Sequence, residues 1–217
     1  MSVQPRFGAE RSKTSDSPTV LLLTAHCDDA ELWAGGTIRR YVNAGWRVRV
    51  GIAHHDALRR EEAEKGACVL EFEPQFRDDR TALRDWVREC LAAAGAEVLL
   101  THSPRDLHPQ HRDVYAATFR TLRGDAYSRW RPDRWYHFDT YLLTHVPATA
   151  PVLIDISSEF PLKCKALRCH QSQSPGRLVR MTRYVSGLHG MQLRTRYAEA
   201  FYPLQLMGEW PRLRDLP

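Results

Sequence analysis

The sequence lacks the features that mark membrane-spanning and secreted proteins. It contains no run of eighteen apolar residues, so we expect no membrane span. Residues 1–18 are polar and contain no apolar core, which is not the pattern of a secretory signal. The five cysteines are odd in number and none lies in a CxxC pair, so no disulfide framework is expected. These absences favour a reduced, cytoplasmic location.

Lysine is also scarce, because only four of the 31 basic residues are Lys. The formal net charge is +5 and the sequence pI is about 9.1, a balance that can attract nucleic acid or other anions. The basic residues are spread along the chain and interleaved with acidic ones, as in Arg59-Arg60-Glu61-Glu62, and there is no compact basic arm. We therefore expect no nucleic-acid partner.

What the sequence does contain is an alternation of apolar runs and helix-period segments. Residues 20–23, flanked by Thr19 and Thr24, are typical of a buried parallel strand. Further strands are expected at 47–52, 72–76, 97–101, 135–143 and 152–156, and helices at 30–42, 58–70, 81–94, 112–122 and 157–169. From residue 176 onwards we expect helical pieces and a proline-bounded tail. This order predicts an α/β fold, namely a single Rossmann-like three-layer domain with a mostly parallel sheet over residues 18–217, after a flexible lead-in at 1–17.

Chemically useful side chains follow the first strand directly. The segment holds one histidine and two adjacent carboxylates, and Gly35-Gly36 follows shortly after it: Thr24-Ala25-His26-Cys27-Asp28-Asp29-Ala30-Glu31. In open α/β sheets, ligands and catalytic groups collect at the carboxyl ends of the strands, so a site is expected here. A histidine beside carboxylates is typical of a metal site. Cys27 would point away from His26 in an extended segment, although a thiolate is also able to bind metal, and both alternatives stay open.

A second polar loop follows the expected strand at 97–101. It contains His108 and His111, whose spacing brings both imidazoles near one point if His111 opens a helix. Two histidines and one carboxylate form a familiar ligand set for a catalytic zinc, which leaves a fourth position for water. Either loop alone is weak evidence, since a histidine near a strand end is commonly just hydrogen-bonded. The two loops together, each after a buried strand, favour a metal-dependent hydrolase.

Both loops resemble the motifs of one known family. Residues 25–37 are similar to AHPDD-x-E-x-x-x-GG-T, the first signature of the PIG-L/LmbE-like zinc N-deacetylases, and residues 106–112 are similar to their second motif. A weaker third element covers residues 165–173. The resemblance extends over roughly residues 20–201, and it implies hydrolysis of an N-acetyl group with zinc as the cofactor.

The resemblance implies a role for each matching residue. His26 and Asp29 from the first motif and His111 from the second would bind zinc. Asp28 would act as the general base, and His108 would act as the general acid or stabilise the oxyanion.

Two positions depart from the family pattern. Cys27 replaces the usual proline, and Gln110 stands where an aspartate usually separates the two histidines. If that aspartate normally tunes His108, Gln110 would leave the pKa of His108 lower and its acid role weaker.

The substrate implied by the resemblance is a small conjugate that contains N-acetylglucosamine, such as a thiol precursor or an antibiotic or other natural-product sugar. Arg59 and Asp106 are the expected substrate contacts, although Arg59 fits a solvated helix face equally well. A related amidase that cleaves a larger acyl group is the alternative. A third hypothesis, a Rossmann-like nucleotide-binding module, is disfavoured because the first βα turn lacks a GxGxxG or P-loop pattern. Assembly into a homo-oligomer stays open.

Overall fold

The computed structural model describes residues 17–124, 130–140 and 151–204. These residues form one seven-stranded sheet with the strand order β3-β2-β1-β4-β5-β7-β6. The strands are β1 (Thr19–Thr24), β2 (Arg47–Ile52), β3 (Glu73–Phe76), β4 (Val98–Thr101), β5 (Arg134–Phe138), β6 (Val152–Asp155) and β7 (Ala198–Pro203). The first five in spatial order are parallel, whereas β7 is antiparallel to both β5 and β6. The predicted α/β fold with a mostly parallel sheet is confirmed.

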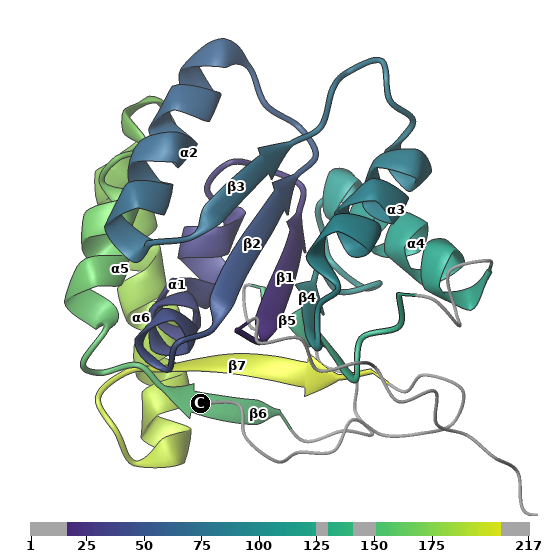
Figure 1. The fold of residues 1–217 in the computed structure, drawn as a ribbon. Helices are drawn as coiled ribbons and strands as arrows, with labels where there is room; N and C mark the ends of the chain where they lie inside the picture. The colour runs from purple at the N-terminus through teal and green to yellow at the C-terminus, as the bar shows by residue number, and fades with distance from the viewer. Residues whose placement is uncertain (1–16, 125–129, 141–150, 205–217) are drawn as a thin grey trace, which may run out of the picture.

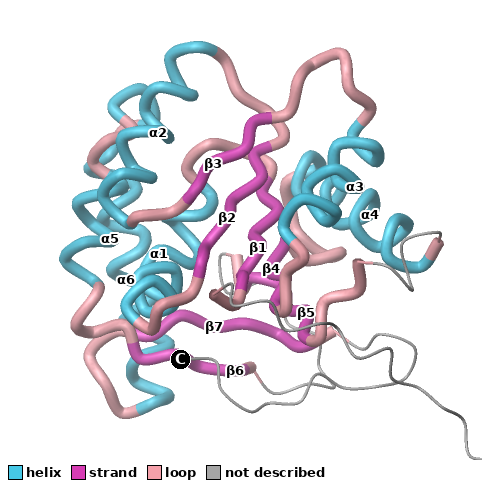
Figure 2. The backbone as a smooth tube through the Cα atoms, in the orientation of Figure 1, coloured by secondary structure: helices cyan, strands magenta, loops and turns pink. Residues whose placement is uncertain are grey.

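Helices cover both faces of the sheet (Figure 1). They are α1 (Asp29–Asn43), α2 (Ala57–Leu70), α3 (Leu83–Ala94), α4 (Pro109–Arg123), α5 (Phe160–Leu167) and α6 (Pro175–Leu193), with a short 3₁₀ turn, η1, at Gln171–Gln173. In Figure 2, α1, α2, α5 and α6 lie on one side of the strands, and α3 and α4 lie on the other. No helix in the described part of the chain is long and apolar enough to cross a membrane.

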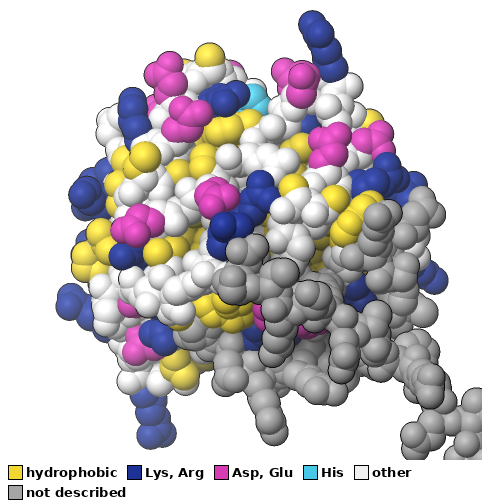
Figure 3. Space-filling model, in the orientation of Figure 1, with side chains coloured by type: hydrophobic (Ala, Val, Ile, Leu, Met, Phe, Trp, Pro, Cys, Tyr) yellow, Lys and Arg dark blue, Asp and Glu magenta, His cyan; other side chains and the backbone are white. Residues whose placement is uncertain are grey.

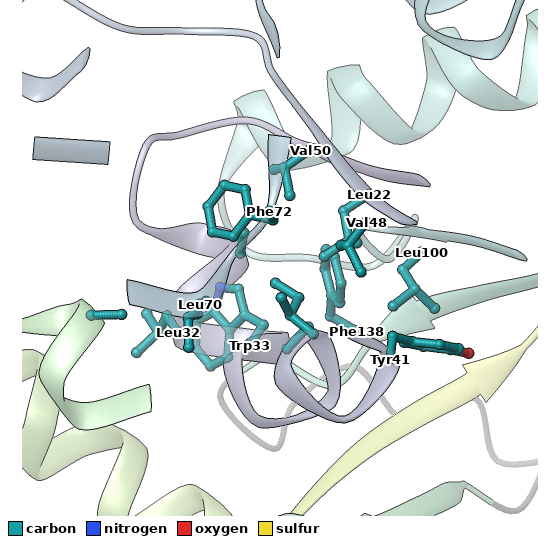
Figure 4. Packing of buried hydrophobic residues seen from close by; sticks show 14 of the residues in the cluster. Leu22, Leu32, Trp33, Tyr41, Val48, Val50, Leu70, Phe72, Leu100 and Phe138 are labelled. Atoms are coloured by element: carbon teal, nitrogen blue, oxygen red, sulfur yellow. The ribbon is translucent and has the colours of Figure 1, made fainter. Parts of the chain in front are cut away.

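Strand β1 feeds two separate cores because its side chains alternate between the faces of the sheet. Val20 and Leu22 belong to the core beneath α1, α2 and α5, while Leu21 and Leu23 belong to the core beneath α3 and α4. Figure 4 shows the first of these cores, in which Leu22 lies among side chains from β2, β4, β5, α1 and α2. A strand that is buried on both faces has apolar surroundings at every position, which explains the unbroken apolar run of β1.

The last strand was not expected from the sequence. The helical pieces expected after residue 176 are found as α6, but residues 198–203 then form β7, which lies between β5 and β6; residues 205–217 of the predicted tail lie outside the described residues. Glu199 interrupts the apolar pattern of β7, yet it is only 3 % exposed, because its carboxylate lies 2.5 Å from Nζ of the buried Lys163. The same carboxylate accepts the backbone N–H groups of Gly36 and Thr37, at 2.9 and 2.8 Å.

The order of the strands fixes where a site can form. From β1 the chain moves to β2 on one side, whereas β4 pairs with β1 on the other side. At such a switch point, the loops that leave the carboxyl ends of the two neighbouring strands diverge and leave a crevice between them. The loops after β1 and β4, which carry the two histidine motifs, therefore face each other. The predicted strand at 135–143 ends at Phe138, and its last three residues lie outside the described ones.

Candidate metal centre

Asp29 is the centre of the polar cluster at this switch point. It is the first residue of α1 and is only 4 % exposed. Its Oδ2 accepts the backbone N–H of His26 at 2.7 Å, and its Oδ1 accepts Nε1–H of Trp33 at 3.3 Å. Burial opposes its ionisation, but the neighbouring His111 and His102 imidazoles outweigh burial and hold the pKa of Asp29 well below its usual value. A buried carboxylate is thus kept charged and aimed into the crevice.

His111 enters the cluster from the first turn of α4. The helix begins at Pro109, earlier than the predicted residue 112, because proline is well suited to the first helical position. Nδ1 of His111 lies 2.9 Å from Oδ2 of Asp106, and Thr140 donates a 2.5 Å hydrogen bond to that same oxygen. Burial lowers the pKa of His111, but Asp29 and Asp106 raise it to about 10. Asp106 therefore orients the ring and leaves Nε2 facing Asp29.

His26 is oriented by a different partner. Its Nε2 lies 2.8 Å from Oε1 of Gln110, so the amide oxygen accepts that proton and leaves Nδ1 facing inward. The sequence comparison connected Gln110 with His108, whereas the structure connects it with His26. The pKa of His108 is lowered by burial and by the charges of His26 and His111. Gln110 thus supports a candidate metal ligand rather than the candidate acid.

Three lone-pair donors converge at this point. Nδ1 of His26 lies 3.1 Å from Nε2 of His111 and 3.4 Å from Oδ2 of Asp29, and Oδ1 of Asp29 lies 3.3 Å from Nε2 of His111. Ligand atoms of a tetrahedral zinc with metal–ligand distances of about 2.0–2.1 Å stand about 3.3–3.4 Å apart. The residues present therefore fit zinc, and each imidazole has an outer partner that fixes its tautomer, as metal ligands usually do.

Two further histidines border this set, and the sequence analysis did not single out one of them. His102 directly follows β4 and stacks on His111 with ring centroids 3.8 Å apart. Its Nε2 is 3.3 Å from Asp29, but it also accepts the backbone N–H of Ala25 at 2.9 Å. That hydrogen bond uses the lone pair a metal would need, so His102 braces the loop after β1. Its position right after a buried strand was the only sequence signal.

His108 lies at the rim of the cluster. It is the N-cap residue of α4 and is exposed, and its ring stands edge-on to His26 with centroids 4.6 Å apart. Its ring nitrogens are near enough to those of His26 and His111 for the three to form an alternative ligand group. The exposed position of His108 instead suits a group that meets a bound molecule.

The cluster opens into a cleft of about 590 Å³. Its walls come from the loops after β1, β2 and β4 together with η1 and the first two turns of α6. Asp28 lines this cleft, and burial and the charge of Asp29 raise its pKa. Arg59 also lines it and donates a hydrogen bond to Gln173 of η1.

Two sequence-derived candidates lie away from the cleft. Asp106, expected to contact substrate, is 1 % exposed and is buried behind His111, where it also accepts the backbone N–H of His108 at 2.9 Å. Cys27 is 1 % exposed and packs in the apolar core, and burial raises the pKa of its thiol to about 12. A thiol held protonated in an apolar environment is a poor metal ligand.

Similar proteins share this fold. The N,N′-diacetylchitobiose deacetylase from Pyrococcus horikoshii is 20% identical, with a TM-score of 0.70 over 88% of this chain and 85% of that one. The 4-carboxy-2-hydroxymuconate hydratase from Pseudomonas putida KT2440 is 18% identical, with a TM-score of 0.70 over 91% and 98% of the two chains. The antimicrobial reagent A40926 pseudoaglycone deacetylase is 18% identical, with a TM-score of 0.69 over 87% and 97%. Because one of the three is a hydratase, the fold alone does not fix the reaction.

The sequence provides the more specific comparison. Residues 21–122 match the model of the family described as PIG-L, GlcNAc-PI de-N-acetylase. The match includes most of β1, the two histidine loops and α4 as far as Leu122, and hence every residue of the converging set. Residues 21–122, a little under half of the chain, therefore carry the PIG-L family domain, described as GlcNAc-PI de-N-acetylase.

Proposed function

We propose that the protein is a zinc-dependent hydrolase that removes an N-acetyl group from an amino sugar in a small conjugate. One observation carries this proposal above the others. Nδ1 of His26, Nε2 of His111 and the Asp29 carboxylate converge with mutual distances of 3.1–3.4 Å. Protein groups already occupy the other nitrogen of each imidazole, so the inward atoms have a metal ion as their natural partner.

The three converging residues would hold the zinc. Zinc supplies Lewis-acid chemistry, which makes water nucleophilic near neutral pH and polarises an acyl carbonyl. Asp29 contributes the one negative charge of the ligand set, and its place at the N-terminus of α1 helps to stabilise that charge. The open side of the cluster faces the cleft, where the substrate would lie.

The remaining polar residues of the cleft would move protons. Asp28 accepts a proton from the attacking water as the new carbon–oxygen bond forms. His108, at the rim, donates to the oxyanion of the tetrahedral carbon or protonates the leaving nitrogen as the carbon–nitrogen bond breaks. Acetate and a free amine are the products. Asp28 has the side-chain exposure that this role needs, because it lines the cleft directly.

The cleft also supports a small, polar substrate. Its volume of about 590 Å³ suits a ligand of one or two sugar rings rather than a polymer. His54, His55 and Arg59 on the wall after β2 offer hydrogen-bond donors for hydroxyl or anionic groups. The structural neighbours act on diacetylchitobiose and on an antibiotic pseudoaglycone, which is the range of substrates we propose to test.

Two other hypotheses are weaker. A related amidase with a larger acyl group would use the same residues and differ only in the shape of the cleft. A nucleotide-binding module would place a phosphate at the N-terminus of α1, but Asp28 and Asp29 stand there and would repel it. The cleft is thus better suited to a cation than to a phosphate.

The test combines metal content with product analysis. The purified protein should contain about one zinc per chain and should release acetate from N-acetylglucosamine conjugates with inositol, malate, aminoglycoside or glycopeptide groups. Acyl-chain profiling with longer N-acyl groups separates the deacetylase from the related amidase. Hydration of 4-carboxy-2-hydroxymuconate without acetate release would instead place the reaction with the hydratase neighbour and overturn the proposal.

A further inference from the structure

A long basic segment stands out from the rest of the chain, and there the expected interleaving of basic and acidic residues is wrong. Residues 160–198 contain eight Lys and Arg and no Asp or Glu, whereas acidic residues outnumber basic ones elsewhere in the sequence. The segment corresponds to α5, η1, α6 and the first residue of β7. A charge asymmetry of this kind points to an anionic partner rather than to a requirement of the fold.

The structure shows that these charges lie on the surface. Lys163 is the exception, because it is buried and paired with Glu199. The other seven are exposed, and in the described part of the chain none of them forms an ion pair with a carboxylate: Lys165, Arg168, Arg177, Arg180, Arg183, Arg194 and Arg196. In Figure 3, dark blue side chains with yellow ones between them occupy the edge at which α5 lies in Figure 1.

Exposed apolar side chains accompany the basic ones. Within the described residues, four of the six large apolar side chains that are well exposed belong to α6. Tyr184, Leu188 and Met191 are 72 %, 45 % and 75 % exposed, and Leu193 is 40 % exposed. The first three follow the i, i+4, i+7 spacing, so they form one stripe along the helix. We call Tyr184, Leu188 and Met191 the apolar stripe of α6.

A second cavity lies between α5, α6 and the start of β7. It has a volume of about 310 Å³ and is lined by Arg168, Arg183 and Arg196 around the stacked rings of Phe160 and Tyr197. Arg183 immediately precedes Tyr184 in α6, so its side chain leaves the helix about 100° from the stripe, on the side that faces α5. Three guanidinium groups around one hollow favour a phosphate group with its several acceptor oxygens.

We propose that the apolar stripe of α6 and its surrounding arginines dock on an anionic lipid bilayer, with the arginine-lined cavity receiving a phosphate-bearing headgroup. Helices that lie in a bilayer interface combine apolar side chains with basic ones in this way. The basic residues are attracted to the negative surface, and the stripe enters the boundary between headgroups and acyl chains. The apolar stripe lies further along α6 than the cleft of the candidate metal centre, whose walls use only the first two turns of that helix, including Arg177.

Charge and chemistry favour a bilayer over two alternative partners for this surface, namely a second copy of the chain and a nucleic acid. In a two-fold dimer through α6, the basic surface would meet its own copy, and the seven unpaired cations would repel one another. A nucleic acid would satisfy the arginines but would leave Leu188 and Met191 without an apolar partner. An anionic bilayer offers phosphates and an apolar layer together, so it satisfies both the arginines and the apolar stripe of α6.

Vesicle co-sedimentation with the full-length protein tests this directly. The protein should sediment with vesicles of phosphatidylcholine mixed with phosphatidylglycerol, and it should stay in solution with phosphatidylcholine alone. Arg183→Gln together with Arg196→Gln should lower the partition coefficient about 25-fold, since each Lys or Arg near the surface is worth about fivefold, or about 1 kcal/mol. Tyr184→Ser together with Met191→Ser should lower it at least about tenfold.

A matched control separates docking from general basicity. Arg84→Gln together with Arg120→Gln removes the same charge from α3 and α4, on the opposite side of the sheet, and should change partitioning less than about twofold. Equal loss in this control, or no binding to anionic vesicles, overturns the proposal. So does a concentration-dependent dimer, or DNA binding, that the Tyr184→Ser, Met191→Ser variant abolishes. The assay needs no substrate, so its outcome is independent of whether the protein is a deacetylase.

Discussion

Two groups of buried ionisable residues stand close to α1, and they are built in opposite ways. At the junction of α1, α5 and β7 each acid has a basic partner: Lys163 lies 2.5 Å from Glu199, and His170 lies 3.1 Å from Glu31. At the cluster around Asp29, a single carboxylate faces two imidazole nitrogens that also face each other, all within 3.4 Å.

The difference separates a structural role from a binding role. The junction balances its own charges, so it needs nothing from outside and fixes how α1 packs on α5 and β7. The cluster balances its charges only when a cation or extra protons are present, which makes it a site. If this comparison is right, disturbing the cluster should change metal content and rate, whereas disturbing the junction should change stability.

The largest effect is expected for His26→Ala. This substitution removes one of three converging ligands, so zinc should be lost and the rate of acetate release should fall at least about 10⁴-fold, because several kcal/mol of transition-state stabilisation disappear. Metal analysis after dialysis and an acetate assay measure the two quantities. Retention of a full zinc equivalent would exclude His26 as a ligand.

Asp28→Ala should lower the rate of acetate release but leave zinc binding intact. The rate should fall about 10²- to 10⁴-fold, the usual contribution of a general base, while the zinc content stays at the wild-type level. The two variants thus serve as controls for each other. Equal zinc loss in both would show that the roles of the two residues are assigned wrongly.

Sequence reasoning located the site because its residues follow two buried strands directly. The His26 and His111 loops could be paired from the sequence since the carboxyl ends of neighbouring parallel strands share one edge of the sheet. His102 could not be found from the sequence, because no second histidine or acidic residue stands at a motif-like spacing from it. Its hydrogen bond to Ala25 connects residues 77 positions apart. It assigned Asp106 to the substrate, because a polar loop residue does not reveal whether it faces the cleft or the protein.

The fold shows the same limit. Strands β1 to β5 were expected from local patterns, but β7 was not, because its buried Glu199 breaks the apolar pattern. Only the partner Lys163, 36 residues earlier, makes that glutamate tolerable inside the protein. Similarly, the sequence does not explain why Gly36, a residue that disfavours helix, stands within α1. In the structure a Cβ at this position would lie 2.5 Å from Cβ of Ile156, so only glycine fits. The sequence therefore does not reveal which distant residue a single residue will contact in the fold.

Lys163→Met tests the junction. The substitution leaves the Glu199 carboxylate buried without its cation, and the free energy of unfolding should fall by about 3–5 kcal/mol, as for other broken buried pairs. Urea denaturation measures the loss. The double variant Lys163→Met, Glu199→Leu should recover part of it, and zinc content per folded chain should stay unchanged. A loss below about 1 kcal/mol would mean that the pair does not secure the junction.

A smaller effect is expected at Gln110. Replacing it with Leu removes the acceptor for Nε2–H of His26, so zinc affinity should fall about 10- to 100-fold, measured by competition with a chelator. Gln110→Glu, which keeps an acceptor oxygen, should bind zinc at least as tightly as the wild type. Gln173→Leu at the cleft rim is the matched control and should leave zinc affinity unchanged. If Gln110→Leu binds zinc as tightly as the wild type, Gln110 does not orient His26 for metal binding.

The smallest effect concerns the pH dependence of the junction. Burial opposes protonation of His170, but the negative charges of Glu31 and Asp28 outweigh it and raise its pKa above the ordinary value. A raised folded-state pKa adds stability that is fully present below the unfolded pKa of about 6.5 and is lost as the pH rises through the folded value. The difference in unfolding free energy between wild type and His170→Gln should therefore be largest near pH 6, about 1–2 kcal/mol, and should narrow toward pH 9. Urea denaturation across this range measures it, and a gap that stays constant would show that His170 and Glu31 share a neutral hydrogen bond instead of a charged one.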